Sequence, residues 1–477
     1  MHNTSEHFIA NARIALHNEQ LQPVLNAVTQ FLPAARSVAL AETPEFRALS
    51  DYAVAMKDHV LEYLDDYLGE FATHVRARGG QVHHAATGAD LNRIVAGICR
   101  ATGARRVIKG KSMVGEETSL NEALETAGFE VVETDLGEYI IQQAQEPPSH
   151  IIGPALHKSK EQVAQLFLDK HDLGPRRLDD VRSMVSEARA VLRERFLEGE
   201  VGITGANALV AETGSFMLVT NEGNGDLSST LPRVHIVIAG IEKLVPTLED
   251  ASALHRVLCR SATGQATSAY TTFYTGPRAP DDPDGPEEFH VVLLDNGRRE
   301  MLNGKYRSML RCIRCGSCLN HCPIYRHVGG HAYGWVYPGP MGSVLTPLLT
   351  GLEGAKELPN ACTACGRCEE ACPMQIPLPE HLRQLRDDER AQHVSPLIWR
   401  LGVAAMRWMF RYPALYRLAC SLARPLLGWL SAHPGLMKKL PILGGWAAGR
   451  TLPAPQSHTF LGQWQRQLAA REQDNRL

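Results

Sequence analysis

The 477-residue sequence contains no hydrophobic run long enough to cross a membrane. A spanning helix needs about 20 mostly apolar residues, whereas the best stretch, between Pro396 and Pro413, is shorter and contains Arg400, Arg407 and Arg411. The first residues also lack the apolar core of a secretory signal. These absences predict a cytoplasmic protein that is either soluble or peripheral to the inner face of the membrane.

A strong excess of one charge is also missing, because the formal net charge is −3. This balance gives no indication of a nucleic-acid partner. The charge is unevenly distributed, however, since residues 391–477 contain eleven Lys and Arg against two Asp and Glu. The same segment holds five of the six tryptophans, namely Trp399, Trp408, Trp429, Trp446 and Trp464. We therefore expect a separate basic, tryptophan-rich helical module at 391–477.

Recognisable nucleotide-binding motifs are absent too. Gly223-Asn224-Gly225 begins like a dinucleotide-binding loop, but the third glycine is missing. The glycine spacing from Gly110 to Gly115 is similar to that of a Walker loop, but Glu116 stands where lysine is required. The sequence therefore shows no recognisable site for flavin, NAD or ATP.

What the sequence does contain is a dense group of cysteines. Eight of its eleven cysteines form two runs with the same spacing, C-x2-C-x2-C-x3-C-P, which begin at Cys312 and Cys362. This spacing is typical of two-cluster bacterial ferredoxins, in which the fourth cysteine of a run binds the other cluster. The runs therefore predict two [4Fe–4S] clusters with crossed ligands. The first set is Cys312, Cys315, Cys318 and Cys372, and the second set is Cys362, Cys365, Cys368 and Cys322.

Two structural zinc sites are the main alternative, because C-x2-C pairs also suit tetrahedral zinc. Zinc would leave the central cysteine of each run, and the proline after its fourth cysteine, without a purpose. A disulfide framework is unusual in the reducing cytosol. The remaining cysteines, Cys99, Cys259 and Cys420, lie at apolar helical positions, where we expect them to pack.

A long segment, 323–361, separates the two runs. Segments of this length are often functional, so it either shields the clusters or forms a surface where a partner docks. His321 and His331 could bind a cluster or donate to its sulfur atoms. Because the eight cysteines already fill the ligand positions, packing is the favoured role for both histidines.

The chain before the cysteines changes its hydrophobic period near residue 76. Helical spacing predicts helices over 1–75, and alternating strands and helices then predict a mainly parallel sheet. Strands are expected at 81–84, 106–108, 129–133, 208–211, 215–219, 235–239, 270–274 and 289–294. Helices are expected at 90–101, 120–127, 159–170, 178–196, 248–259 and 298–311. The domain boundaries are then 1–75, 76–297, 298–390 and 391–477.

Two resemblances rest on these motifs. The double cysteine run with its long insert resembles the ferredoxin-type domains of iron–sulfur oxidoreductase subunits. The segment from about 75 to 295 resembles the lactate-utilisation (LUD) domain. That second likeness is carried by Ile108-Lys109-Gly110-Lys111-Ser112-Met113, Glu116-Glu117, Ser149-His150-Ile151-Ile152-Gly153-Pro154, Ala211-Glu212-Thr213-Gly214-Ser215 and Asn221-Glu222-Gly223-Asn224. In this order, with the basic tail, the chain resembles the lactate-utilisation protein B family.

The family resemblance implies an α/β LUD domain with a Rossmann-like sheet similar to that of CoA transferases, then a helical two-cluster ferredoxin-type domain and a helical tail. It implies the iron–sulfur component of a three-component, NAD-independent system that oxidises L-lactate to pyruvate. The implied partners are a cysteine-rich component resembling heterodisulfide reductase subunits and a smaller LUD-only component. The alternative is a LUD-type ligand-binding or transferase enzyme whose clusters are structural or regulatory.

Four charged residues of the expected sheet domain are candidates for a site. Glu212 and Glu222 flank an apolar stretch, and carboxylates at strand ends of α/β domains often contact ligands. Either could instead be an exposed turn residue or pair with Arg233. Lys109 and Lys111 follow an expected strand and could bind a carboxylate or phosphate, although solvated lysines would look the same.

The basic tail contains one expected amphipathic helix. Arg400, Arg407 and Arg411 fall within about 40° of one helical face, while Ile398, Ala405 and Met409 lie on the opposite face. Such a helix could dock on an acidic partner or an anionic membrane surface. It could also be a cap on the cluster domain with a solvated basic face. The enrichment of Trp and Arg in interfaces slightly favours docking.

Overall fold

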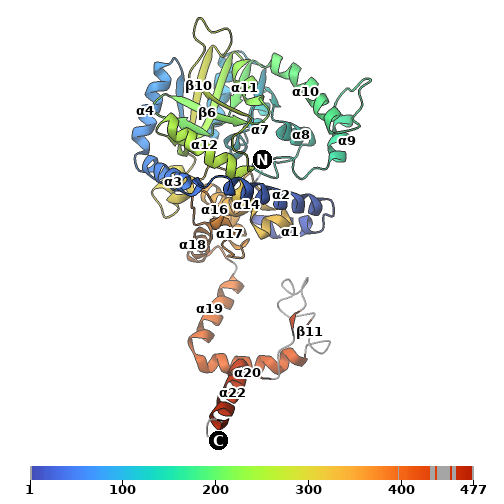
Figure 1. Ribbon diagram of the computed structural model, residues 1–477, viewed down its shortest axis with the longest axis vertical. Coiled ribbons are helices and arrows are strands. Elements are labelled where there is room, and N and C mark those ends of the chain that lie inside the picture. The colour runs from blue at the N-terminus through green and yellow to red at the C-terminus, as the bar shows by residue number, and fades with distance from the viewer. Residues whose placement is uncertain (1–2, 396, 430–435, 438–451, 454–457, 475–477) are drawn as a thin grey trace. The chain divides into compact units, whose positions relative to one another are not determined.

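The computed structural model describes residues 3–395, 397–429, 436–437, 452–453 and 458–474. It divides into two compact units, Met1–Val394 and Ser395–Leu477. The first unit contains two β-sheets and both cysteine runs, and the second is mainly helical (Figure 1).

A six-stranded parallel sheet forms the centre of the first unit, in the order β1-β10-β7-β4-β2-β3. Its strands are β1 (Gln81–Ala85), β2 (Arg106–Lys109), β3 (Glu130–Glu133), β4 (Val201–Thr204), β7 (Val234–Gly240) and β10 (Glu288–Leu294). All residues of β4 and β7 are buried, as is typical of parallel strands covered on both faces. The predicted parallel α/β sheet is confirmed, but its inner strand β4 was not predicted.

Helices cover one face of this sheet completely and part of the other. α5 (Gly88–Ala101) and α7 (Leu120–Thr126) pack in one hydrophobic cluster with alternate residues of the central strands. α8 (Leu136–Ala144), α9 (Lys160–Lys170) and α10 (Val181–Glu198) pack against Ile108 and Val132, which point to the opposite face. The predicted helices at 90–101, 120–127, 159–170 and 178–196 are therefore confirmed, within a few residues at their ends.

A second sheet packs against part of that opposite face. It has the order β8-β5-β6-β9 and consists of β5 (Ala208–Val210), β6 (Ser215–Thr220), β8 (Leu244–Val245) and β9 (Tyr270–Tyr274). Phe216 of β6 stacks on Phe289 of the main sheet, with ring centroids 6.1 Å apart. The expected strands at 208–211, 215–219 and 270–274 are present, but they form a separate sheet. α12 (Leu248–Ala262) confirms the helix expected at 248–259.

The cysteine-containing region consists of short helices around both runs. They are α13 (Arg298–Leu302), α14 (Ser317–Asn320), α15 (Pro323–Val328), α16 (Gly339–Thr350), α17 (Arg367–Glu370) and α18 (Leu378–Ala391). The expectation of one helix over 298–311 is wrong, because α13 ends at Asn303-Gly304 and a separate 3₁₀ turn covers Arg307–Arg311. One hydrophobic core continues from the second sheet into this region, so residue 297 marks no gap in packing.

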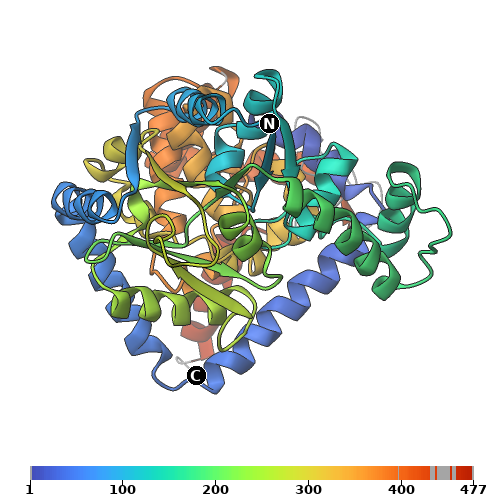
Figure 2. The same cartoon turned by 90° about the horizontal axis from the view of Figure 1, so that it is seen from above.

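The N-terminal helices join these two regions. They are α1 (Phe8–Leu16), α2 (Leu21–Ala41), α3 (Phe46–Glu62) and α4 (Leu64–Ala77), as the helical spacing over 1–75 predicted. Figure 2 shows them along two sides of the first unit. Arg36 of α2 donates to the carbonyl of Ala371, and Asp58 of α3 forms an ion pair with Arg311 at 2.6 Å. The helices therefore contact the residue before the first cysteine run and a residue within the second.

The second unit contains α19 (Leu397–Arg411), α20 (Pro413–Trp429) and α22 (Phe460–Asp474), with a short antiparallel pair, Leu436–Met437 and Leu452–Pro453. The helix expected near 396–413 is therefore present, and it has no buried residue. Trp446, which the sequence placed in this module, lies outside the described residues. Within the described part of the chain, no helix is both long and apolar enough to span a bilayer.

Candidate metal centres and adjoining cavity

The two cysteine runs fold into the same local structure. In the first, Arg314 and Gly316 adopt left-handed backbone angles, with φ of 61° and 75°, and α14 follows. In the second, Ala364 and Gly366 do the same, with φ of 54° and 81°, before α17. Glycine suits such angles because it has no Cβ. The sequence duplication is thus a structural duplication.

The eight thiols gather around two cavities. One is bordered by Cys312, Cys315, Cys318 and Cys372. The other is bordered by Cys322, Cys362, Cys365 and Cys368. Each cavity therefore receives three cysteines of one run and the fourth of the other run.

The electrostatics of the thiols show the same grouping. Burial, together with the neighbouring Cys372, raises the pKa of Cys315 to about 12. Burial also raises the pKa of Cys322 to about 11, with Cys362 and Cys365 as its thiol neighbours. Such thiols remain protonated at neutral pH, so iron binding must displace their protons.

Backbone donors reach the sulfur atoms as well. The Ala364 N–H donates to Cys362 Sγ at 3.2 Å, and the Ile376 N–H donates to Cys372 Sγ at 3.5 Å. Hydrogen bonds to sulfur stabilise the thiolate form and tune the potential of iron–sulfur clusters. Within the described residues, no three His, Cys, Asp or Glu side chains converge as ligands of one single metal ion. Four soft thiol ligands around each cavity fit a [4Fe–4S] cluster.

The two cavities differ in their exposure. The first loop packs against the sheet domain, because a Cβ at Gly316 would lie 3.3 Å from Ile152. In the second loop Cys365 is exposed, as are Ala364 and Arg367. The first cysteine loop therefore lies against the sheet domain, whereas the second reaches the surface at Cys365, although Cys322 and Cys368 of its thiol set are buried.

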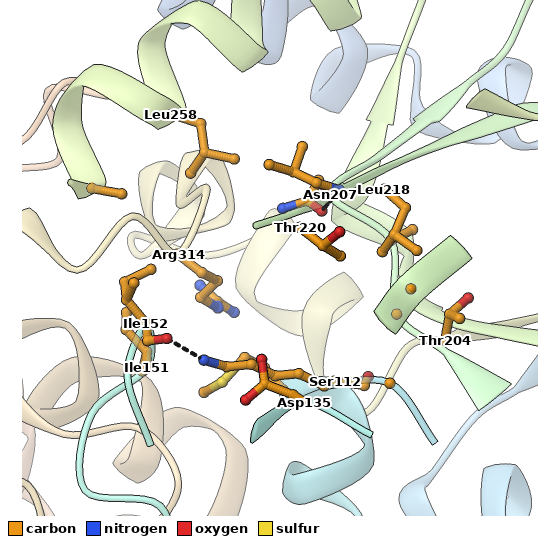
Figure 3. A pocket seen from close by; sticks show the side chains of 18 of the residues that line it. Ser112, Asp135, Ile151, Ile152, Thr204, Asn207, Leu218, Thr220, Leu258 and Arg314 are labelled. Atoms are coloured by element: carbon orange, nitrogen blue, oxygen red, sulfur yellow. Dashed lines mark hydrogen bonds between the residues drawn. The ribbon is translucent and has the colours of Figure 1, made fainter. Parts of the chain in front are cut away.

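A larger cavity, of about 280 Å³, opens beside the first thiol set. Its walls include Lys111, Asp135, Gly205 and Lys243, which lie just beyond the carboxyl ends of β2, β3, β4 and β7. Ligands of parallel α/β sheets bind at this edge. Figure 3 shows the guanidinium of Arg314 directed into this space. We refer to it as the strand-end cavity.

Three residues connect the strand-end cavity with the first thiol set. Ile151, Ile313 and Arg314 border both cavities. Ile313 and Arg314 lie between Cys312 and Cys315 in the sequence. A molecule in the strand-end cavity would therefore lie next to the loop that carries three of the four thiols.

A buried network of ion pairs adjoins Arg314. Arg298, 2% exposed, binds both oxygens of Glu117 at 2.8 and 3.0 Å and Glu242 at 2.6 Å. Arg314 lies 3.5 Å from the other oxygen of Glu242, and the Tyr337 hydroxyl donates to Glu117 at 2.6 Å. The network thus ties the LUD-like region to the cysteine-containing region with few exposed atoms.

Comparison with known proteins identifies both regions. The LUD domain family matches residues 68–294, and the 4Fe-4S dicluster domain family matches residues 308–376. Lactate utilization protein B of Bacillus licheniformis is 42% identical over 453 residues, which are 93% of each chain. The chain belongs to the lactate utilization protein B family. The Bacillus subtilis protein of that name is also 42% identical, over 450 residues and 93% of each chain.

Membership of the lactate utilization protein B family gives the chain an iron–sulfur role in lactate utilisation, with two [4Fe–4S] clusters as cofactors. A solved structure of a DUF162 family protein from Deinococcus radiodurans covers 48% of this chain and 98% of its own, at 14% identity and a TM-score of 0.28. The family and cofactors predicted from the cysteine runs and LUD motifs are therefore confirmed.

Only two of the four charged candidates of the LUD domain, Glu222 and Lys111, border the strand-end cavity. Glu222 borders the strand-end cavity and accepts a hydrogen bond from the Leu136 N–H, while Glu212 lies elsewhere and accepts from the Leu248 N–H. Lys111 also borders the cavity and donates to the carbonyl of Ile152. Neither glutamate pairs with Arg233, which lies 3.4 Å from Glu288.

Lys109 is not available to a ligand. It is fully buried and pairs with Glu133 at 2.7 Å and Glu116 at 3.2 Å. Burial opposes its charge, but these carboxylates outweigh that effect and raise the pKa of Lys109. The lysine therefore completes an internal ion pair, and a role in binding a substrate carboxylate or phosphate is wrong for this residue.

The insert between the runs is largely buried. Tyr333, Tyr337 and Met341 each expose 1% of their surface, which favours the shielding interpretation over a docking surface. His321 contacts the carbonyl of Ser317, and His331 that of Pro147, so both histidines pack as expected. Among the scattered cysteines, Cys99 and Cys259 are buried and Cys420 is half-buried.

Sequence reasoning missed three residues at the junction. Arg314, Lys243 and Glu242 border the strand-end cavity, but Glu242 and Lys243 lie far from Arg314 in the sequence and in no recognised motif. One signal was present: the duplicated loops carry Arg314 and Ala364 at the same position. That difference identifies the first loop as the one with an additional charged side chain.

Proposed function

We propose that this chain is the iron–sulfur electron-transfer component of an NAD-independent system that oxidises L-lactate to pyruvate. The observation that carries the proposal is the pair of four-thiol cavities, one beside the strand-end cavity and one whose Cys365 is exposed. When bound, [4Fe–4S] clusters take up and release single electrons. A pair of such centres that leads from a ligand cavity to an exposed loop suits that task.

The proposed ligands follow the two cavities. Cys312, Cys315, Cys318 and Cys372 would hold the first cluster, and Cys362, Cys365, Cys368 and Cys322 the second. The exposed loop around Cys365 would face a redox partner. The proposed partners are a cysteine-rich component similar to heterodisulfide reductase subunits and a smaller LUD-only component.

Anaerobic purification gives the first test of this proposal. We expect about eight iron and eight sulfide per chain and a brown colour that dithionite bleaches. Replacing Cys322 and Cys372 together by alanine should abolish lactate oxidation by the reconstituted complex, because each cluster loses a ligand. Cys420→Ala is the matched control, since Cys420 lies outside both thiol sets, and it should retain iron and activity.

The same experiment separates the second candidate function, a LUD-type ligand-binding or transferase enzyme with structural clusters. The strand-end cavity is the observation that favours it. If the double cysteine variant stays folded by circular dichroism, lacks iron and still supports lactate oxidation, electron transfer is not the role of the clusters. Two zinc ions without inorganic sulfide would contradict both candidates.

For the second unit we propose peripheral contact with an anionic membrane surface through α19. Its arginines share one face, and Trp399, Trp408 and Phe410 are each at least 59% exposed. Basic amphipathic helices with exposed tryptophan bind such surfaces. The full chain should sediment with vesicles containing phosphatidylglycerol and less with neutral vesicles or at high salt. Replacing Arg400, Arg407 and Arg411 by glutamine should abolish this binding, whereas the same change at Arg182, Arg189 and Arg193 should not.

A further inference from the structure

The first cysteine loop carries an arginine that its backbone does not require. Arg314 lies between Cys312 and Cys315, and its counterpart in the duplicated loop is Ala364. Both have left-handed backbone angles, so alanine is sufficient to form this loop. The guanidinium of Arg314 must therefore be explained by what surrounds it.

The side chain of Arg314 has unused hydrogen-bonding capacity. It is about 10% exposed, its Nη2 lies 3.5 Å from Glu242, and its Cζ lies 4.9 Å from the centre of the Tyr337 ring. Its Nη1 is buried and has no hydrogen-bond partner. A buried guanidinium donor without an acceptor costs free energy, and Figure 3 shows the guanidinium of Arg314 directed into the strand-end cavity.

A second cation borders the same end of the cavity. Lys243 is half-buried, and no hydrogen bond or ion pair joins its Nζ to any described residue. The hydroxyl of Thr220, on the facing wall, is also buried without a partner.

The carboxylates around the cavity are already engaged. Glu242 binds Arg298, Glu222 accepts from the Leu136 N–H, and Asp135 accepts from the Glu138 N–H as the cap of α8. Lys111 is engaged as well, through the carbonyl of Ile152. The unsatisfied groups beside the first thiol set are therefore mainly donors, and two of them carry positive charge.

We propose that the strand-end cavity binds a small monocarboxylate, held by Arg314 and Lys243 beside the first thiol set. The planar fork of arginine matches the two oxygens of a carboxylate. A volume of about 280 Å³ suits a molecule of a few carbon atoms. Asp135 and Glu222, which also border the cavity, would repel a second negative charge. The inference rests on the proposed function only for its choice of probes, L-lactate and pyruvate.

Calorimetry on the anaerobically purified holoprotein tests the site without requiring turnover. We expect L-lactate or pyruvate to bind one site per chain, and inorganic phosphate to bind at least about tenfold more weakly. Arg314→Ala should weaken monocarboxylate binding about 10- to 100-fold, because a charge-assisted pair is lost. Lys243→Gln should weaken it in the same direction. Arg307→Ala, which removes an exposed arginine paired with Glu62 outside the cavity, should leave the affinity unchanged.

A spectroscopic measurement places the ligand. Bound monocarboxylate should alter the electron paramagnetic resonance spectrum of the first cluster in Cys322→Ala protein, and should leave the second cluster of Cys372→Ala protein unchanged. Iron content equal to wild type in Arg314→Ala would show that the variant folds, as Ala364 in the sister loop leads us to expect.

The outcomes separate this site from the proposed function. Full iron content with no binding of either monocarboxylate at millimolar concentration would overturn the site while leaving electron transfer intact. Unchanged affinity in Arg314→Ala would overturn it too, and would restrict the arginine to balancing cluster charge. Phosphate binding as tight as lactate would overturn the monocarboxylate class. Binding that depends on Arg314, in a protein that cannot support lactate oxidation, would support the site and contradict the proposed function alone.

Discussion

Replacing Arg298 by alanine is expected to lower the free energy of unfolding by about 3–5 kcal/mol, because it leaves buried charges without their partner. Arg298 bonds to both oxygens of Glu117 and to Glu242, and all three side chains are at most 3% exposed. These residues come from the LUD region and from the start of the cysteine-containing region, so the loss should loosen the junction. The urea midpoint of the anaerobic protein, followed by circular dichroism, measures the change.

The neighbouring residue provides a matched control. Arg299 pairs with Asp65 at 2.6 Å, but the two side chains are 46% and 75% exposed. Exposed ion pairs contribute about 0–1 kcal/mol, so Arg299→Ala should shift the urea midpoint far less than Arg298→Ala. Equal shifts in the two variants would show that burial of the Arg298 network has no energetic consequence.

The effect of Arg298→Ala should also depend on pH. In the native protein burial opposes ionisation of Glu242, but Arg298 and Arg314 outweigh it and lower its pKa to about 2. The ionised carboxylate therefore stabilises the fold above its unfolded pKa of about 4.3, and this contribution is lost as the pH falls toward 2. Without Arg298 burial would raise the pKa, so the variant should regain stability as the pH falls. The difference from wild type should therefore narrow as the pH falls.

The sequence predicted most of the main sheet, because its strands are short apolar runs punctuated by glycine. It missed β4, whose sequence Val-Gly-Ile-Thr lies between Gly199 and Gly205 and carries little strand signal. Gly202 is required there by tertiary contact, since a Cβ would lie 1.7 Å from the carbonyl oxygen of Ser228. Local strand propensity could not predict β4, because its glycine is required by a contact with another segment of the chain.

The candidate site, too, was predicted from the sequence only in part. The cysteine spacing is a local pattern, so it predicted both loops and the grouping of the thiols seen around the two cavities. The strand-end cavity depends on residues brought together by the sheet, and Arg314 and Lys243 are 71 positions apart. Glu212 and Glu222 were both chosen as candidate site residues because they flank a predicted strand. Only Glu222 borders the strand-end cavity. The rule that ligands bind at the carboxyl ends of parallel strands predicts which edge of the sheet holds the site, but it does not predict which side chains meet there.

Replacing Cys322 alone by alanine is expected to destroy the second cluster and to leave the first intact. Cys322 is the fourth cysteine of the first run, but α14 carries it to the cavity that it shares with Cys362, Cys365 and Cys368. Alanine removes the ligand without offering an oxygen in its place. Iron and sulfide should each fall from about eight to about four per chain, if each cluster holds four of each. Cys372→Ala should cause the same loss of iron, but from the first cluster.

Alkylation of Cys365 distinguishes the two variants, because this thiol is exposed and reacts when no iron holds it. With crossed ligands, iodoacetamide under anaerobic conditions should modify Cys365 in Cys322→Ala protein and not in Cys372→Ala protein, as mass spectrometry would show. Ligation of each cluster by a single run predicts the opposite pattern, since Cys372→Ala would then release Cys365. Modification in both variants at full retention of four iron atoms would contradict either arrangement, because the exposed thiol would not be a ligand at all.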